Sequence, residues 1–259
     1  MKTFFRYPGG KSKIANIIVP LLPEHDTYIE PFVGAGAIFL KVLEQKRFRK
    51  YIINDKNYAI FSIWHSIQNF PNELNTRLLN FVPSVEAYND FKNILINHSS
   101  DIVETAFMKI ALHQTSFSGL GEKSGGPIGG QYQSSKYAID CRYNPERIAN
   151  DISKISKLMQ NVTVLNLDYE KVLLEGALYI DPPYYEVGHT LYQTSMTEDE
   201  HVKLHSLLVQ KDNWLLSYDN CEFVKNLYSD CKIRTIEDLH YSINSKRSNF
   251  SNELLITKT

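Results

Sequence analysis

The tetrapeptide Asp181-Pro182-Pro183-Tyr184 joins an acid, two prolines and an aromatic ring in four positions. The preceding run, residues 176–180, is short, apolar and partly aromatic or β-branched, which predicts a buried strand. Two prolines cannot continue the ladder of a central strand, so we expect the chain to leave the sheet at Asp181. The motif then offers a carboxylate, carbonyl acceptors and an aromatic face. This combination suits a flat group that carries an NH2, such as the exocyclic amine of a nucleobase. The simpler alternative is an aspartate that caps a turn.

The elements that must position this motif follow an alternating pattern of strands and helices. Strands are predicted at 27–30, 51–53, 162–165, 176–180, 214–217 and 254–256. Helices are predicted at 37–43, over much of 58–112 (including 86–97 and 101–114), at 145–159 and from Thr197 to about Lys211, where Thr197 and Glu200 form a capping box. We therefore expect an α/β fold, in which ligands bind at the carboxyl ends of the strands.

A glycine turn follows the first predicted strand and contains Gly34 and Gly36. A full GxGxxG is absent and no P-loop lysine follows, so phosphate binding is weakly supported. A ligand without phosphate, whose adenosine lies over the turn, fits better. Asp55 ends the next predicted strand, where an acid can accept hydrogen bonds from ribose hydroxyls. The alternative is that Asp55 caps a helix.

Composition narrows the class of protein. The chain has 259 residues, 43% of them hydrophobic, and a formal charge of −1. Its three cysteines are isolated and no CxxC pair exists, so neither a disulfide framework nor a zinc site is indicated. No stretch of about 18 apolar residues occurs, and we expect a soluble protein of the cytoplasm. Basic residues gather at 41–50, but the charge alone does not decide for or against a nucleic-acid partner.

Six of the chain's 12 glycines fall between Ser116 and Gln133. Such a stretch predicts a loop or hairpin, and dense glycine suits a backbone that approaches another molecule closely. A flexible surface loop is the alternative. We expect this stretch to belong to an insertion at about 58–150.

Several motifs, in order, resemble those of the Dam-like D12-class (α-group) DNA adenine-N6 methyltransferases over nearly the whole chain. They are Tyr7-Pro8-Gly9-Gly10-Lys11, Glu30-Pro31-Phe32-Val33-Gly34-Ala35-Gly36, Asn54-Asp55, Asp168, Asp181-Pro182-Pro183-Tyr184, and the segment from Lys246-Arg247 to Glu253-Leu254-Leu255-Ile256. The resemblance implies a Rossmann-like fold with a mixed, mostly parallel sheet. It also implies a catalytic domain of residues 1–57 and 151–259 and a target-recognition domain of residues 58–150.

The resemblance also implies the cofactor, the partner and the roles of residues. The cofactor is S-adenosylmethionine, and its expected contacts are Tyr7, Gly9, Lys11, Glu30, Pro31, Phe32, Gly34, Gly36, Asp55, Asp168 and Asp181. The expected catalytic residues are Asp181, Pro182, Pro183 and Tyr184. Asp181 and the Pro182 carbonyl would accept the two N6 hydrogens of adenine, Tyr184 would stack on the base, and the base must leave the duplex. No metal is expected.

Double-stranded DNA is the expected partner, bound by a monomer or a weak dimer. The expected DNA contacts are Lys123, Gln131, Lys136, Arg142, Lys246 and Arg247. The glycine-rich segment does not match the hairpin usual in GATC-specific members, so the recognition sequence stays open, as does a role in a restriction system, a phage or regulation. Alternatives are cytosine-N4 methylation, an RNA or protein-glutamine substrate, and a non-catalytic regulator that binds S-adenosylmethionine and DNA.

Overall fold

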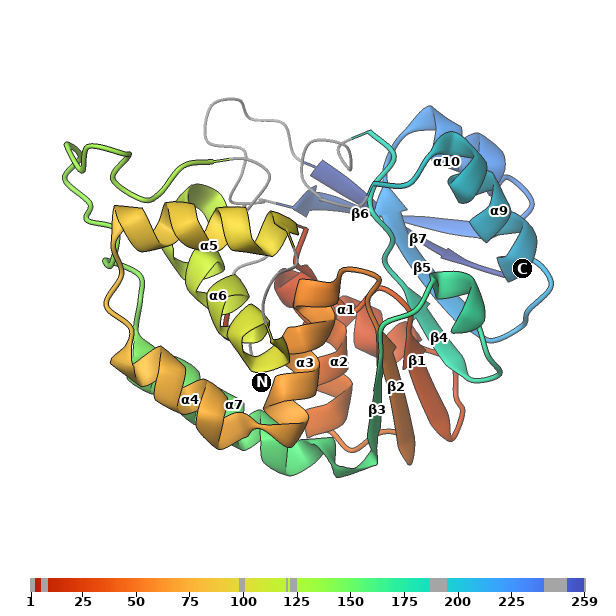
Figure 1. Cartoon of the computed structure of the whole chain (residues 1–259). Coiled ribbons are helices and arrows are strands. Elements are labelled where there is room, and N and C mark those ends of the chain that lie inside the picture. Colours follow the sequence, from red (N-terminus) through yellow and green to blue (C-terminus); the bar gives the residue numbers. More distant parts are fainter. Residues whose placement is uncertain are drawn as a thin grey trace.

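The computed structural model describes residues 3–5, 9–97, 101–119, 121, 125–186, 195–239 and 251–258. These residues form a seven-stranded sheet in the order β3-β2-β1-β4-β5-β7-β6 (Figure 1). The strands are β1 (Thr27–Glu30), β2 (Lys50–Asn54), β3 (Val162–Leu165), β4 (Ala177–Ile180), β5 (Trp214–Asp219), β6 (Lys232–Leu239) and β7 (Ser251–Thr257).

Five strands, β1 to β5, run parallel, and β7 is inserted antiparallel between β5 and β6. The expected mixed, mostly parallel sheet is therefore confirmed, and each of the six predicted strands is present. The strand β6 was not predicted. It lies at the edge of the sheet, where Lys232 and Arg234 stay exposed, so its apolar pattern is weak.

Helices cover both faces of the sheet and form a separate group beside it. The helices near the sheet are α1 (Ala15–Ile18), α2 (Ala37–Glu44), α3 (Tyr58–Asn69), α9 (Glu198–Leu208) and α10 (Glu222–Leu227), with the short 3-10 turns η1 (Lys11–Lys13), η2 (Val19–Leu21), η4 (Met159–Asn161) and η5 (Tyr169–Lys171). The predicted capping box is confirmed, since Thr197 N–H donates to Glu200 Oε2 over 2.7 Å. The helix ends at Leu208, earlier than Lys211.

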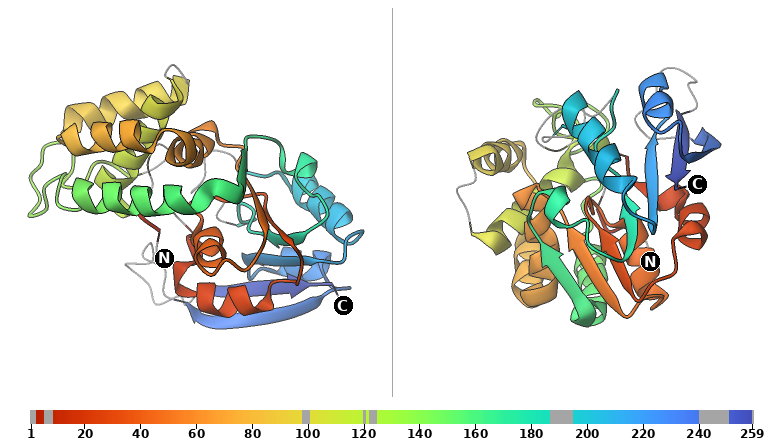
Figure 2. Two further views of the ribbon diagram at one scale, coloured as in Figure 1. Left: turned by 90° about the horizontal axis from the view of Figure 1, so that it is seen from below. Right: turned by 90° about the vertical axis from the view of Figure 1, so that its right-hand side faces the viewer.

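The chain between β2 and β3 is mainly helical. It contains α3 (Tyr58–Asn69), α4 (Pro71–Asn80), α5 (Val85–Asn97), α6 (Ile102–Thr115), the turn η3 (Phe117–Gly119) and α7 (Pro145–Leu158). The helix α4 packs against α7, and α5 packs against α6, to one side of the sheet (Figures 1 and 2). The domain boundary expected after residue 150 falls inside α7.

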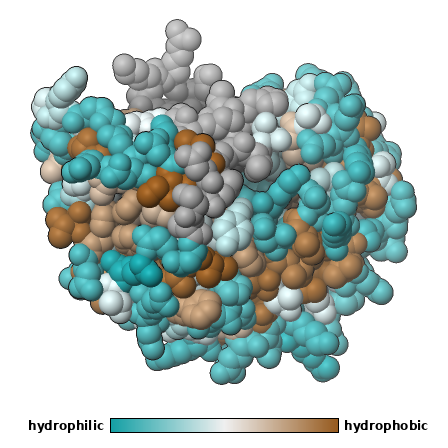
Figure 3. Space-filling model, viewed as in Figure 1, coloured by the Kyte–Doolittle hydropathy of each residue, from teal (hydrophilic) through white to brown (hydrophobic). Residues whose placement is uncertain are grey.

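The core lies on the two faces of the sheet. Successive strand residues point to opposite faces, so Tyr28 joins a cluster around Trp64, while Ile29 joins a cluster around Trp214. Figure 3 shows one face of the molecule as largely hydrophilic, with hydrophobic side chains in separate areas. In the described part of the chain, no helix has the length and apolar character that crossing a membrane requires.

Candidate active site

A cavity of about 290 Å³ lies at the carboxyl ends of β1, β2 and β4. The loops that follow these strands meet there, as expected for an open α/β sheet. The sequence-predicted residues that line it are Gly9, Lys11, Glu30, Pro31, Phe32, Gly34, Gly36, Asp55, Asp168, Asp181 and Pro183. Tyr7 lies outside the described residues. The structure thus brings together residues from five separate motifs.

Asp55 holds the glycine turn that follows β1. Its Oδ2 accepts from the Gly34 N–H over 3.0 Å, and its Oδ1 accepts from the Asn57 N–H over 2.9 Å. Burial raises the pKa of Asp55 to about 6, although these two N–H groups oppose the shift. The alternative that Asp55 caps the next helix is wrong, because the side chain of Asn57 caps α3. A carboxylate accepts up to four hydrogen bonds, so Asp55 keeps capacity for a ligand.

Trp64 of α3 packs against the glycine turn and stabilises it. Its indole Nε1 donates to the Gly34 carbonyl over 2.9 Å, and its ring is fully buried. Gly36, which precedes α2, has φ +66°. The turn therefore depends both on a left-handed glycine and on α3, the helix that follows β2.

Asn54 joins the ends of three strands. Its Nδ2 donates to the carbonyls of Pro31 (2.9 Å) and Leu167 (3.0 Å), and its Oδ1 accepts from the Leu167 N–H over 2.9 Å. The side chain is buried and fully engaged. Asn54 thereby fixes the chain after β1 and after β3 at the cavity.

Asp181 is held at the end of β4 by a lysine and a serine. Lys11 Nζ lies 2.7 Å from Asp181 Oδ1, and Ser217 Oγ on β5 donates to the same oxygen over 3.1 Å. Burial raises the pKa of Asp181 to about 6; Lys11 opposes this shift and Glu253 adds to it. Among the described residues both donors contact Oδ1, which leaves Oδ2 for a further donor. The alternative of a simple turn cap does not account for this buried lysine.

Tyr184 belongs to the same network. Its hydroxyl donates to Glu253 on β7, and Lys11 Nζ lies 4.7 Å from the centre of its ring. Tyr218 of β5 stacks near the ring at 6.2 Å. An aromatic face with an ammonium group beside it therefore adjoins the cavity.

Glu30, at the end of β1, is a second buried acid in the cavity wall. The Tyr28 hydroxyl donates to Glu30 Oε2 over 2.7 Å. Burial raises the pKa of Glu30 well above its ordinary value, although the hydrogen bond from Tyr28 opposes the shift.

Asp168 lies at the exposed rim, where its Oδ1 is 2.6 Å from Lys56 Nζ. The hydrogen bond from Lys56 lowers the pKa of Asp168. A ligand amine that approaches Asp168 must share this carboxylate with Lys56. The sequence did not predict this ion pair.

The expected DNA-binding residues that the structure describes differ in their surroundings. Gln131 exchanges hydrogen bonds with Asn89 over 3.1 and 3.2 Å, whereas Lys136 lies over the ring of Tyr137 at 5.0 Å. Arg142 is exposed. The glycine-rich segment pairs with itself, because Phe117 N–H donates to the Gly126 carbonyl over 2.9 Å, which agrees with the predicted hairpin. Lys123, Lys246 and Arg247 lie outside the described residues.

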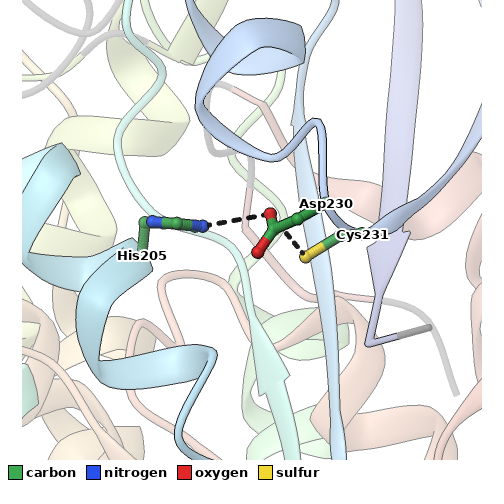
Figure 4. Close-up of side chains that lie close together, drawn as sticks. All are labelled: His205, Asp230 and Cys231. Carbon is green, nitrogen blue, oxygen red and sulfur yellow. Dashed lines mark hydrogen bonds and ion pairs between the residues drawn. The ribbon is translucent and has the colours of Figure 1, made fainter.

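One group of possible metal ligands lies outside the cavity. His205 on α9 and the consecutive Asp230 and Cys231 place their ligand atoms within 4.8 Å of one another (Figure 4). The Asp230 Oδ1 contacts the other two residues over 3.5 Å each. Burial raises the pKa of the Cys231 thiol to about 11, and Asp230 is mostly exposed. The hydrogen bonds of the Asp230 carboxylate with the Cys231 thiol and the His205 imidazole account for the closeness of these three side chains.

The sheet order, the cavity and the acids at the strand ends define a Rossmann-like methyltransferase. The family model for D12 class N6 adenine-specific DNA methyltransferase matches residues 7–242, and the chain belongs to this family. The match decides for adenine N6 over cytosine N4 and for an enzyme over a non-catalytic regulator.

Similar proteins carry related names. The type II methyltransferase M1.LlaDCHI of Lactococcus lactis subsp. cremoris is 27% identical over 92% of this chain and 88% of its own length. The type II methyltransferase M.MjaIII of Methanocaldococcus jannaschii is 26% identical over 91% of each chain. The DNA adenine methylase of Escherichia coli (strain K12) is 25% identical over 73% of this chain and 67% of its own length.

Sequence reasoning missed several residues that shape the site. Ser217 and Glu253 contact the Asp181 network from β5 and β7, Trp64 supports the glycine turn, and Lys56 pairs with Asp168. Ser217 carries a detectable signal, since it is a polar residue within a strongly apolar strand. Trp64 carries none, because a buried tryptophan in a helix is normal core.

Proposed function

We propose that the chain transfers a methyl group from S-adenosylmethionine to adenine N6 in duplex DNA, at the cavity described above. The observation that carries this proposal is the composition of the cavity wall. It contains six acids and two lysines, with a glycine turn beside them: Glu30, Asp55, Asp168, Glu170, Asp181, Glu200, Lys11 and Lys56. An acidic wall fits a cationic sulfonium and disfavours a phosphate-bearing cofactor.

The cofactor would lie over the glycine turn. Asp55 would accept from ribose hydroxyls, and Asp168, released in part from Lys56, would accept from the adenine amino group of the cofactor. Gly9, Lys11 and Glu30 would line its methionine end. Bound S-adenosylmethionine would supply an electrophilic methyl group, and the bond from N6 to this carbon would form as the bond from carbon to sulfur breaks.

Asp181 would orient the target amine. Its Oδ2 and the Pro182 carbonyl would accept the two N6 hydrogens, which directs the nitrogen lone pair at the methyl group from about 3 Å. Tyr184 would stack on the base. Asp181 need not be a strong base, because the proton can leave after the methyl group has been transferred. Reaching this pocket requires the adenine to leave the duplex.

We assign DNA recognition to residues 58–150, with the glycine-rich segment as the part that contacts bases. The exposed donors Lys136 and Arg142, which follow this segment in the chain, support this role. Gln131 would have to exchange its bond with Asn89 for one with DNA. The names of the type II methyltransferases among the relatives favour a role in a restriction–modification pair.

The test is a product analysis. Purified protein, unmethylated bacterial genomic DNA and labelled S-adenosylmethionine are incubated, and the digested nucleosides are separated. We expect N6-methyladenine alone, and modification-sensitive sequencing then gives the site. N4-methylcytosine, or no methylated nucleoside from a folded protein, would contradict the proposal.

A further inference from the structure

Glu253 on β7 is a buried acid that faces the same lysine as Asp181. It is 1% exposed, its Oε1 lies 3.4 Å from Lys11 Nζ, and it accepts the hydrogen bond of the Tyr184 hydroxyl. We infer that Glu253 is a positioning residue for methyl transfer, which holds the Tyr184 ring and the Lys11 ammonium group against Asp181. This inference rests on the proposed function of the same site.

The first part of this role concerns Tyr184. Its hydroxyl donates to Glu253, the Lys11 ammonium lies 4.7 Å from its ring centre, and the Tyr218 ring is stacked near it at 6.2 Å. These contacts set both the plane and the rotation of the ring before any base arrives. A prearranged stacking face spares the entropy of ordering it during the reaction.

The second part concerns Lys11, which lies in η1 and is 3% exposed. Its Nζ donates to the Gly9 carbonyl over 2.9 Å and lies between the two carboxylates, 2.7 Å from Asp181 and 3.4 Å from Glu253. Sharing one ammonium group between two buried acids leaves Asp181 less stabilised as an anion than it would be with Lys11 alone.

In the described part of the chain, titratable, charged and hydrogen-bonding groups on several elements face Asp181. They are Lys11 on η1, Tyr28 and Glu30 on β1, Tyr179 on β4, Ser217 on β5 and Glu253 on β7. Burial raises the pKa of both tyrosines well above their ordinary value, so the tyrosines are uncharged when Asp181 titrates. Burial also raises the pKa of Glu30 well above its ordinary value.

Removal of the Glu253 charge should therefore change the pKa of Asp181 in a known direction. The negative charge of Glu253 raises the pKa of Asp181, so its loss lowers that pKa. If the ionised carboxylate accepts from the target amine, activity falls as the pH drops through the pKa of Asp181. The acid limb of kcat/KM reports this pKa in the free enzyme, and it moves to lower pH when Glu253 is neutral.

Two substitutions distinguish the effect of the Glu253 charge on Asp181 from the hydrogen bond that holds the Tyr184 ring. Glu253→Gln keeps the size and an acceptor for Tyr184 but removes the charge, and we expect the acid limb to move down by about half a pH unit or more. Tyr184→Phe removes only the hydroxyl and keeps the charge. We expect it to lower kcat at least about fivefold, as preorganisation is lost, with the acid limb unmoved.

Glu198→Gln is the matched control. Glu198 Oε2 accepts from the hydroxyl of Tyr185 over 2.8 Å, so the chain offers the same tyrosine–glutamate pair next to Tyr184 but outside the cavity lining. This variant should keep the pH profile and the kcat of the parent. A merely structural Glu253 would change the melting temperature without moving the acid limb.

The experiment measures methylation of unmethylated genomic DNA between pH 5 and 9, with the melting temperature and the cofactor affinity of each variant. A parent protein that produces no N6-methyladenine refutes the proposed function. An active parent whose Glu253→Gln variant keeps the same acid limb overturns the inference instead. Should Glu253→Gln fail to fold, a Tyr184→Phe variant with parental kcat overturns the inference equally.

Discussion

Trp64 occupies the space that a side chain on Gly36 would need. A Cβ atom added to Gly36 would lie 2.5 Å from Trp64 Cζ2 and 2.7 Å from Cη2. The ring is fully buried and its indole N–H is bonded to the Gly34 carbonyl, so it cannot move aside without breaking the support of the turn. The helix α3, which carries Trp64, thus constrains the shape of the expected cofactor loop.

Gly36→Ala tests this relationship. The substitution combines a left-handed backbone, at φ +66°, with a clash against a packed ring. We expect a loss of about 2–4 kcal/mol in the free energy of unfolding and weaker cofactor binding. Gly126→Ala is the control, because a Cβ there meets nothing within 4 Å. Equal denaturant midpoints for both variants would contradict the account.

Asp55→Ala should weaken binding of S-adenosylmethionine by about 1–3 kcal/mol, because ribose hydroxyls lose an acceptor and the Gly34 N–H loses its partner. Titration calorimetry measures the dissociation constant directly. Asp26→Ala removes an exposed acid outside the cavity lining and serves as control. If both variants bind the cofactor like the parent, Asp55 only supports the backbone.

Asp181→Ala should abolish methyl transfer while cofactor binding stays largely intact, since Asp181 faces the target amine. One lost transition-state contact costs at least about 1.4 kcal/mol, or tenfold in rate. Single-turnover methylation with saturating cofactor and DNA gives the chemical rate. A rate within tenfold of the parent would remove Asp181 from the catalytic role.

Asp181 should also link stability to pH. Its pKa is about 6 in the folded protein against an ordinary value of 3.8, so the folded state binds the proton more tightly than the unfolded state. The resulting stabilisation is fully present below 3.8 and is lost as the pH rises through 6. Relative to Asp181→Asn, the parent should gain about 1–3 kcal/mol between pH 7.5 and 4. Urea unfolding of both proteins at several pH values measures the gain; parallel curves would contradict it.

Replacement of residues 121–133 by a neutral linker should erase sequence preference and weaken DNA binding, yet leave cofactor affinity at the parental value. Lys136→Ala should instead weaken binding evenly across sequences and flatten its salt dependence. Competition binding with specific and unrelated duplexes distinguishes the two effects. A linker variant that methylates the same site at the parental rate would place recognition elsewhere.

Local sequence patterns predicted most of the elements, because apolar runs between turn residues suffice to mark a buried strand. They could not show which strands become neighbours. The contact between Lys11 and Glu253 depends on β7 entering between β5 and β6, which no local pattern encodes. Asp55 was predicted as a ligand-binding acid, but its bond to Gly34 was not, because that bond depends on β1 and β2 being neighbours.

The position of β7 has a consequence for how the enzyme becomes active. This strand follows all the other described strands in the chain, and it must pair with β5 before Glu253 can reach Lys11 and Tyr184. Contacts between distant parts of a chain form slowly, because loop closure must precede them. During refolding, methylation should therefore return later than helical circular dichroism. Until β7 has paired with β5, a refolding chain would have its glycine turn but would lack the contacts of Glu253 with Lys11 and Tyr184.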